Sequence, residues 1–468
     1  NDPKDVPGLV RALSEVLARN ALGPTTNALA EEARRRGIPT LRLDKQSFVQ
    51  LGYGSRQHRL RASITDKTSQ VAVAMAGNKD LTKAMLLDLG LPAPRGTVVR
   101  RVDEALTFAR ELDHPVVIKP LDGNHGRGVS TDLVTDDQIR TAFAAAAAIS
   151  ARVIVEQHLP GDDHRILVVA GKLVAVARRA PASVTGDGFH SVAQLIDLLN
   201  EDPRRGDGHE KVLTKIKLDA SLHDMLERQG MHLATVPQAG ETVLLRGTAN
   251  LSSGGTSTDR TDDIHPHNRL IAELAARTIG LDIAGVDFVC PDIRRPVAET
   301  GGGIVEINAA PGFRMHLAPS YGPARDVAAP VIDMLFPRGA RSRIPIVAVT
   351  GTNGKSTTAR MISAILRENG NCVGMTNTSG VYVDDLLLKS GDASGPRSAG
   401  MVLRNPAVDA AVLETARGGI LREGLGFDTC SVGVVLNVSE DHLGLKGVDT
   451  LEELAAIKAV VVSSVARK

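Results

Sequence analysis

The sequence predicts an α+β domain followed by an α/β domain whose parallel sheet is incomplete. Short apolar runs suited to hairpin strands dominate the chain as far as residue 307. Continuous apolar runs, typical of strands buried on both faces of a parallel sheet, replace them after residue 343. A segment rich in Pro, Gly and Arg at 336–345 lies between the two patterns and predicts a domain boundary.

The first domain is expected to mix helices with paired strands. Its strand candidates lie at 115–119, 152–157, 165–169, 172–177, 285–290 and 304–307. Apolar residues three and four positions apart predict helices at 78–89, 102–112 and 267–279. We expect this domain to span residues 63–337, preceded at 1–62 by the end of an N-terminal domain and a linker.

The second domain is expected at 346–468, after a linker at 338–345. A buried strand is predicted at 344–350, and a helix at 355–368 is followed by Gly370. Further buried strands are predicted at 410–414 and 431–437. The last helical pattern stops without a cap and the chain starts at Asn1, so we expect a fragment whose second domain is truncated at its C-terminus.

The composition excludes several classes of function. Lys plus Arg number 55 and Asp plus Glu 54, which leaves no basic surface for non-specific binding to nucleic acid or an acidic membrane. With 8 Phe, 3 Tyr and no Trp, platforms for stacking bases are not expected. No apolar stretch is long enough to cross a membrane. Three widely separated cysteines fit neither a zinc site nor a disulfide framework, so we expect a cytoplasmic protein.

A phosphate-binding loop is expected at the start of the second domain. Gly351-Thr-Asn-Gly-Lys-Ser356 follows an apolar strand and opens a helix, a context in which backbone N–H groups bind phosphate. Lys355 is expected to reach the terminal phosphates, and Ser356 to supply an oxygen to Mg²⁺. Val349 stands where the longer phosphate-loop pattern begins with Gly, so the loop is of a shorter kind. The competing interpretation is a Gly-containing turn with a solvated lysine.

Two later strand ends carry polar groups toward the same crevice, because ligands of open α/β sheets bind beyond the carboxyl ends of strands. Glu414 ends one strand, and Asn437, Asp441 and His442 follow another. An acid and a histidine at this place can hold Mg²⁺ against a triphosphate. Taken alone, His442 is better explained as a capping or core histidine, but its place behind a phosphate loop favours the metal-binding role.

These motifs resemble the ATPase core of the Mur ligases. The run 413–445, which contains Glu-Thr-Ala-Arg-Gly-Gly, is similar to the second half of the cyanophycin synthetase family. The resemblance implies an ATP site, Mg²⁺ ligands at Ser356, Glu414 and His442, and a carbamylated lysine at Lys458, with Lys446 also nearby. The implied ATP-binding residues are Gly351, Thr352, Asn353, Gly354, Lys355, Ser356 and Thr357.

A metal site is expected in the first domain. The runs 286–289 and 304–308 read as neighbouring strands, and alternation places Glu306 and Asn308 on one face, where Asp287 can point as well. Two carboxylates and an amide that converge need a cation, and oxygen ligands without His or Cys favour Mg²⁺. The alternative is a solvent-facing hairpin with ordinary polar residues.

Basic and Gly-rich segments before this hairpin suit a nucleotide. Lys119 ends an apolar strand and precedes a Gly-rich loop at 122–128, whose Gly126 and Gly128 allow it to cover phosphates. Lys79 begins a helix and supplies a second positive charge.

Another strand closes with Glu156, Gln157 and Leu159, which offer hydrogen bonds to a purine, and Asp163 is placed for ribose hydroxyls. The order of these segments, with Asn-Ala-Ala-Pro-Gly at 308–312, resembles an ATP-grasp ligase. The resemblance implies that the two lysines bind ATP, that the segment from Glu156 binds adenine, and that the hairpin carboxylates and amide bind Mg²⁺.

Both domains are suited to activating a carboxylate by phosphoryl transfer, after which an amine attacks the acyl phosphate. The resemblance to cyanophycin synthetases covers nearly the whole chain and implies the substrates. The ATP-grasp domain adds L-aspartate to the C-terminus of a poly-aspartate primer, and the Mur-like domain joins L-arginine to the aspartate side chain. Arg165, Arg246 and Arg260 are candidates for contacts with an acyl phosphate or with polymer carboxylates. We expect a homo-oligomer that binds neither nucleic acid nor membranes.

Three alternatives remain open from the sequence. A ligase similar to glutathione synthetase uses the first site but leaves the second phosphate loop unexplained. A relative that polymerises preformed dipeptides is expected to lose the second site, whose Lys355, Glu414 and His442 are present. A nucleotide-binding scaffold without enzymatic activity tolerates the loss of both sets of metal ligands.

Overall fold

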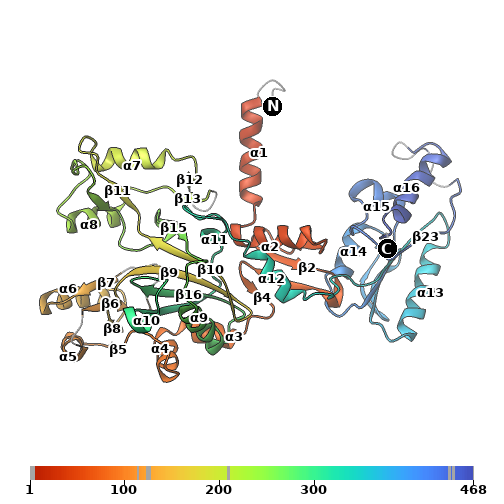
Figure 1. Cartoon of the computed structure of the whole chain (residues 1–468). Coiled ribbons are helices and arrows are strands. Elements are labelled where there is room, and N and C mark those ends of the chain that lie inside the picture. Colours follow the sequence, from red (N-terminus) through yellow and green to blue (C-terminus); the bar gives the residue numbers. More distant parts are fainter. Residues whose placement is uncertain are drawn as a thin grey trace. The chain divides into compact units, whose positions relative to one another are not determined.

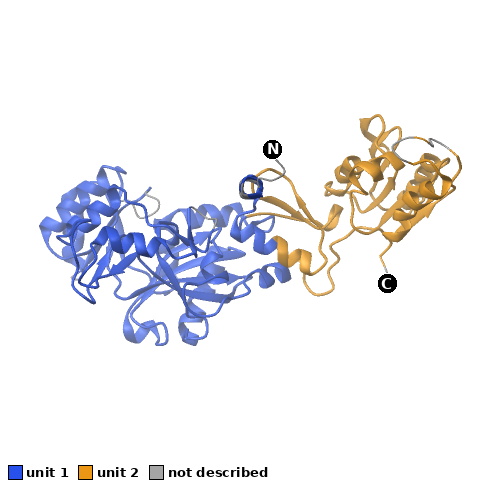
Figure 2. Cartoon of the chain, turned by 90° about the horizontal axis from the view of Figure 1, so that it is seen from above, with its two compact units in different colours: residues 1–29, 62–334 blue, residues 30–61, 335–468 orange. Residues whose placement is uncertain are grey.

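The computed structural model describes residues 6–112, 115–122, 128–207, 211–440, 444 and 448–466. The chain forms two compact units, shown in different colours in Figure 2: unit 1 comprises residues 1–29 and 62–334, and unit 2 comprises residues 30–61 and 335–468. In the part of the chain that the structure describes, no helix has the length and apolar character needed to cross a membrane.

Unit 1 is built on a five-stranded antiparallel sheet, and Figure 1 labels β9, β10, β15 and β16 of it. Its strand order is β15 (Thr256–Asp259), β10 (Lys172–Ala180), β9 (Asp162–Val169), β16 (Ile283–Cys290) and β17 (Gly303–Ala309). The predicted pairing of 286–289 with 304–308 is confirmed by β16 and β17. Because neighbouring side chains along a strand point to opposite faces, polar residues such as Arg165 and Asp287 share one face, and Ile166 and Val286 share the other.

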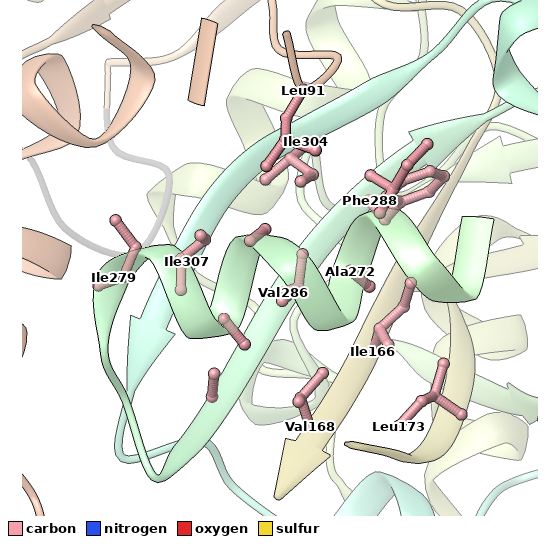
Figure 3. Packing of buried hydrophobic residues seen from close by; sticks show 14 of the residues in the cluster. Leu91, Ile166, Val168, Leu173, Ala272, Ile279, Val286, Phe288, Ile304 and Ile307 are labelled. Atoms are coloured by element: carbon pink, nitrogen blue, oxygen red, sulfur yellow. The ribbon is translucent and has the colours of Figure 1, made fainter. Parts of the chain in front are cut away.

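Helix α9 (Pro266–Ile279) covers the apolar face of this sheet. Its buried residues recur at helical spacing, and Gly280 ends it in the left-handed conformation. Figure 3 shows Ala272 and Ile279 of this helix in one cluster with Val286 and Phe288 of β16. Burial of a side chain such as Ile279, Val286 or Phe288 contributes about 1.5–3 kcal/mol to the stability of the fold. The cluster therefore stabilises the strands that carry the polar face.

A second sheet of unit 1 has the order β5 (Gly96–Val99), β8 (Val153–Gln157), β6 (Val116–Pro120) and β7 (Ser130–Leu133). Helices α5 (Val102–Leu112) and α6 (Asp136–Ala147) pack on it through an aliphatic core. Helix α6 begins behind a capping box formed by Thr135 and Gln138, which satisfies two N-terminal donors. The predictions of a helix at 102–112 and a strand at 152–157 are confirmed.

The segment 182–245 has a small core of its own, which includes Ile196, Leu222 and Val243. It contains β11 (Ser183–Thr185), α7 (Val192–Asn200), β12 (Arg205–Gly206), β13 (Leu213–Thr214), α8 (Ala220–Arg228) and β14 (Thr242–Leu244). The other elements of the chain's first 335 residues, apart from a meander described below, are α1 (Val6–Asn20), α2 (Pro24–Arg35), β4 (Ile64–Thr65), α3 (Gln70–Gly77), α4 (Lys79–Asp88), η2 (Leu251–Ser253), α10 (Val297–Thr300), α11 (Arg314–Leu317) and α12 (Ala328–Leu335).

Unit 2 contains a six-stranded sheet. Its order is β21 (Leu386–Ser390), β20 (Gly380–Val383), β19 (Val373–Asn377), β22 (Ala410–Glu414), β18 (Ile346–Thr350) and β23 (Val432–Val435). The last four strands in this order are parallel, as predicted for this sheet, although β19 is not among the strands expected from the sequence. Its helices are α13 (Lys355–Glu368), α14 (Pro396–Leu403), α15 (Arg417–Glu423) and α16 (Leu451–Ser463).

The antiparallel edge hairpin β20–β21 is a departure from the predicted parallel sheet. Strand β21 is exposed along its whole length, and three consecutive leucines, Leu386 to Leu388, face solvent. An edge strand of this kind shows neither the alternation nor the buried apolar run by which strands are recognised in a sequence. The sequence pattern therefore gave no sign of it.

A short meander of strands at residues 40–61 belongs to unit 2, although it precedes most of unit 1 in the sequence. It consists of β1 (Thr40–Arg42), β2 (Phe48–Leu51), η1 (Gly54–Arg56) and β3 (His58–Arg61). Tyr53 is buried in a cluster with Ile344 and Val408. Ser55 Oγ donates to Asp409 Oδ1 at 2.7 Å. Residues that the sequence assigns to the end of an N-terminal domain and a linker thus complete the core of the α/β unit.

Gly54 is expected to be essential to this packing. Its φ is +55°, and an ideal Cβ here would lie 2.4 Å from the carbonyl oxygen of Val408. We expect Gly54→Ala to lower the free energy of unfolding of unit 2 by about 2–4 kcal/mol, because the left-handed backbone and the clash both oppose a side chain. Gly37→Ala is the matched control, since Gly37 has a φ of +70° but nothing within 4 Å of its ideal Cβ. Urea unfolding compares the variants, and equal losses would show that the close approach to Val408 is unimportant.

Candidate active sites

An acidic pair lies on the polar face of the large sheet in unit 1. Asp287 of β16 and Glu306 of β17 are direct register partners, so their side chains share this face. Asn308 Nδ2 donates to Asp287 Oδ2 at 3.4 Å. The structure brings together the three residues that the sequence predicts as Mg²⁺ ligands.

Two arginines bind Asp287. Arg165 of β9 donates to both carboxylate oxygens, and Arg179 Nη2 of β10 lies 3.1 Å from Oδ2. Burial raises the pKa of Asp287, but the charges of the two guanidinium groups outweigh this effect and hold the pKa below its usual range. Gly285 leaves room for Arg165, because an ideal Cβ at Gly285 would lie 3.1 Å from Arg165 Nη1. Asp287 is therefore a fixed, ionised carboxylate.

Three lysines lie around Glu306 and Glu156. Lys79 Nζ is 3.9 Å from Glu306 Oε2. Lys119 Nζ donates to Glu156 Oε1 at 2.5 Å, and Lys83 forms an ion pair with Oε2 of the same carboxylate. Lys83, Lys119 and Glu156 are all buried. Two buried lysines that share one carboxylate leave an excess positive charge, which suits an anionic ligand.

Lys83 was missed by the sequence analysis. It lies four residues after Lys79 on α4, so the two lysines share a helix face, and this spacing is the signal that could have revealed it. Burial lowers the pKa of Lys83 to about 8 and lowers the pKa of Lys119 well below its usual range. A negative charge nearby would therefore raise the pKa of both amines and favour their charged forms.

Replacing Lys83 by methionine is expected to weaken the use of ATP by unit 1. The change leaves Glu156 with Lys119 as its remaining lysine partner, so Lys119 is held more tightly and is less available to a phosphate. We expect the KM for ATP in aspartate-dependent ADP release to rise about tenfold, which corresponds to ~1.4 kcal/mol. Lys172→Met, which removes an exposed lysine at the start of β10, is the control. An unchanged KM in a folded Lys83→Met variant would contradict this role.

The segment at the end of β8, residues 157–158, is hydrogen-bonded to the backbone of neighbouring segments. The N–H groups of Gln157 and His158 donate to the carbonyl oxygens of Arg95 and Pro115, each at 2.8 Å. Leu159 follows directly, and Asp163 lies on the polar face. Arg179 Nη2 donates to Asp163 Oδ1 at 2.7 Å.

The Gly-rich loop falls mostly on residues that the structure does not describe. Gly126 lies outside the described residues. Gly128 is described and has a φ of +68°. Asp122, at the start of the loop, accepts a hydrogen bond from Ser150 Oγ at 3.0 Å.

Arg246 and Arg260 lie elsewhere in unit 1. Arg246 is buried and donates through Nη1 to Asp219 Oδ1 at 2.6 Å, beside the small core of the segment 182–245. Arg260 pairs with Asp263 at 2.9 Å and lines a cavity of about 210 Å³ with His164, which points to the sheet face opposite Arg165. Of the three candidate arginines, the structure brings Arg165 alone to Asp287.

The phosphate loop of unit 2 connects β18 to α13, which begins at Lys355 as predicted. The N–H groups of Thr352 and Asn353 donate to Asn437 Oδ1 at 3.2 and 2.9 Å. Lys355 Nζ donates to the Thr352 carbonyl oxygen at 2.8 Å. Gly351 precedes these residues, Gly354 is the N-cap of α13, and Thr357 lies in its first turn. The loop is therefore held by the strand end that the sequence places in the same crevice.

Glu414 ends β22 and is buried beside this loop. Its Oε2 accepts hydrogen bonds from Ser356 Oγ at 2.6 Å and from the Thr378 N–H at 3.3 Å. Its Oε1 has no hydrogen-bond partner among the described residues. A buried carboxylate oxygen without a partner, next to a hydroxyl group, fits a divalent cation. His442, the third expected ligand, lies outside the described residues.

Neither candidate metal site rests on a cluster of acids and histidines. Within the described ranges, there is no group of three or more His, Cys, Asp and Glu side chains that could hold a metal ion. In unit 1 the third candidate ligand is the amide of Asn308. In unit 2 the described candidate ligands are the Glu414 carboxylate and the Ser356 hydroxyl.

A cavity of about 740 Å³ adjoins the phosphate loop and is lined by Gly351, Thr352 and Lys355, together with residues of α14, α15 and α16. Lys458 of α16 also lines it. This lysine is buried and donates through Nζ to the Gly351 carbonyl oxygen at 2.8 Å. The structure places the expected carbamylated lysine against the phosphate loop.

Family models match both units. Residues 83–188 match the ATP-grasp domain of prokaryotic glutathione synthetase, and residues 349–468 match the Mur ligase middle domain. The crystal structure of a bifunctional glutathione synthetase from Pasteurella multocida superposes with a TM-score of 0.54. It is 32% identical and covers 68% of this chain and 44% of its own.

Cyanophycin synthetases resemble the chain over nearly its whole length. The enzyme from Geminocystis herdmanii is 52% identical over 456 residues, and that from Nostoc sp. is 52% identical over 459 residues, in each case 97% of this chain. The chain spans about half the length of these relatives, 52% and 51% respectively. The matched length includes both units and both sites. Over nearly its whole length the chain is therefore similar to cyanophycin synthetases, with an ATP-grasp domain followed by a Mur ligase middle domain.

Proposed function

We propose that the chain supports amide-bond formation driven by ATP at two sites, one in each unit. One observation carries the proposal: a face of carboxylates, arginines and lysines in unit 1 and a phosphate loop with a buried carboxylate in unit 2 occur in one chain. Two separate nucleotide sites suit two bond-forming steps.

In unit 1, the lysines are proposed to offset the phosphate charge of ATP. Asp287, Glu306 and Asn308 are proposed to hold Mg²⁺, which when bound neutralises phosphate oxygens. A carboxylate oxygen of the acceptor attacks the γ-phosphorus, the bond to the bridging oxygen breaks, and ADP leaves. The amine of the incoming amino acid then attacks the acyl carbon, loses a proton and expels phosphate. Arg165 and Arg179 lie where they can stabilise the charge of the acyl phosphate.

In unit 2, the same chemistry is proposed with different groups. Lys355 and the loop N–H groups bind the nucleotide, and Ser356 with Glu414 is the proposed Mg²⁺ site, completed by His442. Lys458 touches the loop that carries the phosphates, so its modification by carbon dioxide would place a negative charge near the metal.

The proposed substrates rest on the similarity to cyanophycin synthetases. We propose that unit 1 adds L-aspartate to the C-terminus of a poly-aspartate backbone, and that unit 2 joins L-arginine to the aspartate side chain, giving cyanophycin. The cysteines Cys290, Cys372 and Cys430 are all free, which favours a reducing cytoplasm. A function like that of glutathione synthetase accounts for unit 1 but gives no role to the phosphate loop of unit 2.

The test is ADP release from ATP with a short cyanophycin primer and each amino acid alone or together, using this chain and a full-length relative. The chain is expected to release ADP with aspartate, and arginine is expected to support further release when unit 2 is active. No release above the ATPase background with either amino acid, by a folded chain, would contradict the proposal.

A further inference from the structure

The cavity of unit 2 extends well beyond the phosphate loop. Besides the loop and Lys458, it is lined by Lys389 at the end of β21, by the start of α14, and by α15 from Arg417 to Glu423. Helices α14 and α15 pack against one another, so this wall is one continuous piece of structure. The proposed function assigns no role to this wall.

The wall is strongly basic. The cavity lining contains six basic side chains and two acidic ones, Asp392 and Glu423. Glu423 is paired with Arg397, whose Nη2 lies 2.8 Å from Oε1. Asp392 Oδ1 accepts hydrogen bonds from the N–H and the hydroxyl of Ser394. Both acids therefore have partners of their own.

Two of the basic groups, Lys389 and Arg422, have no ion-pair partner among the described residues. Both belong to the wall and not to the phosphate loop. Arg417 lines the same wall and opens α15. Lys389 and Arg422, which line the cavity without an acidic partner in the described part of the chain, are therefore placed to receive an anion from outside the protein.

The anion can be a nucleotide or a carboxylate. The loop N–H groups, Lys355 and Ser356 already provide for the phosphates at one part of the cavity. Lys389, Arg417 and Arg422 come from two further elements, so they suit a ligand with several negative charges spaced along its length. A guanidinium group binds a carboxylate through two parallel hydrogen bonds, which adds specificity to the charge.

We infer that Lys389, Arg417 and Arg422 form a binding site for the carboxylates of an acidic polypeptide, the poly-aspartate acceptor. This deepens the proposed function of unit 2 and rests on it. The wall holds neighbouring aspartates of the polymer while one carboxylate is presented to the nucleotide at the phosphate loop.

The direct test is binding of a fluorescent deca-aspartate peptide to the chain, followed by anisotropy. Arg422→Gln and Lys389→Gln are each expected to weaken binding about five- to tenfold, and binding is expected to vanish at about 1 M salt, where charges are screened beyond about 3 Å. Arg360→Gln is the matched control, because Arg360 is an exposed arginine of the same unit that bonds Ser379 and does not line the cavity. It is expected to leave the affinity unchanged.

A second measurement locates the peptide. A carbodiimide joins a carboxylate to a lysine amine in contact with it, and mass spectrometry identifies the lysine. We expect the crosslink at Lys389 in the unsubstituted chain, and we expect it to decrease in Arg422→Gln. Equal peptide affinity in Arg422→Gln and Arg360→Gln, with no crosslink at Lys389, would overturn the inference.

Measuring ATP binding by the same variants shows whether the wall binds the nucleotide or the polypeptide. If Arg422→Gln weakens ATP as much as the peptide, the wall serves the nucleotide and the inference is refuted. Failure of the proposed function gives a different combination of results. Peptide binding would still depend on Arg422, but arginine would produce no ADP release from the chain or from a full-length relative.

Discussion

Replacing Glu306 by glutamine is expected to reduce aspartate-dependent ADP release by about 10²–10³-fold. Glu306 lies opposite Asp287 in the β16–β17 pair and 3.9 Å from Lys79 Nζ, so it is the proposed metal ligand on the lysine side of the site. The amide keeps the size of the side chain but removes its charge. A metal that stabilises phosphoryl transfer contributes several kcal/mol, and each ~1.4 kcal/mol lost is a factor of ten in rate.

The measurement is coupled-enzyme detection of ADP with primer, aspartate and varied Mg²⁺. Partial recovery of the rate at high Mg²⁺ is expected if the variant binds the metal weakly. Glu299→Gln is the control, since Glu299 is an exposed residue of unit 1 that pairs with Arg295 at 3.3 Å. Near-normal release by Glu306→Gln at low Mg²⁺ would show that the metal is held by other groups.

Replacing Lys355 by alanine is expected to weaken nucleotide binding by unit 2 strongly and to leave unit 1 active. Lys355 is the positive side chain of the phosphate loop, and it contacts the loop at Thr352. A hydrogen bond to a charged group contributes about 1.5–3 kcal/mol, so we expect a loss of about 10–10²-fold in affinity. Unit 1 keeps Lys79, Lys83 and Lys119.

Calorimetry with a non-hydrolysable ATP analogue measures the number of nucleotides bound. We expect two sites in the unsubstituted chain and one in Lys355→Ala at concentrations that saturate unit 1, while aspartate-dependent ADP release persists. Arg360→Ala, on the exposed side of the same helix, is the control and should retain both sites. Two unaltered sites in Lys355→Ala would place the second nucleotide elsewhere.

The local part of each site could be predicted from the sequence because its residues are close along the chain. The strand, the Gly-rich turn and helix α13 follow one another between residues 346 and 368. Capping and helical periodicity act over a few residues, so these bounds are recoverable from the pattern alone. Asp287, Glu306 and Asn308 lie on a single hairpin, where alternation along two paired strands decides which side chains share a face.

Tertiary structure decided which charged groups meet. Lys83, Lys119 and Glu156 come from a helix and two strands that lie far apart in the sequence, and their ion pairs exist only because the fold brings Lys83 of α4 to the neighbouring strands β6 and β8. Arg165, Arg246 and Arg260 have the same chemistry in the sequence, yet they meet Asp287, Asp219 and Asp263 respectively. The partner of a long, charged side chain is selected by the packing of the element that carries it.

By itself, the sequence determined the two classes of domain, their order, the phosphate loop and the carboxylate hairpin, because each is encoded by spacing within a short segment. The assignment of residues 30–61 to unit 2, the exposed edge strand β21 and the lysine pair around Glu156 were decided by the folded chain. These features depend on contacts between segments up to several hundred residues apart, such as that of Ser55 with Asp409. A local pattern carries no information on such contacts, since their free energy depends on surfaces that come together only when the whole unit folds.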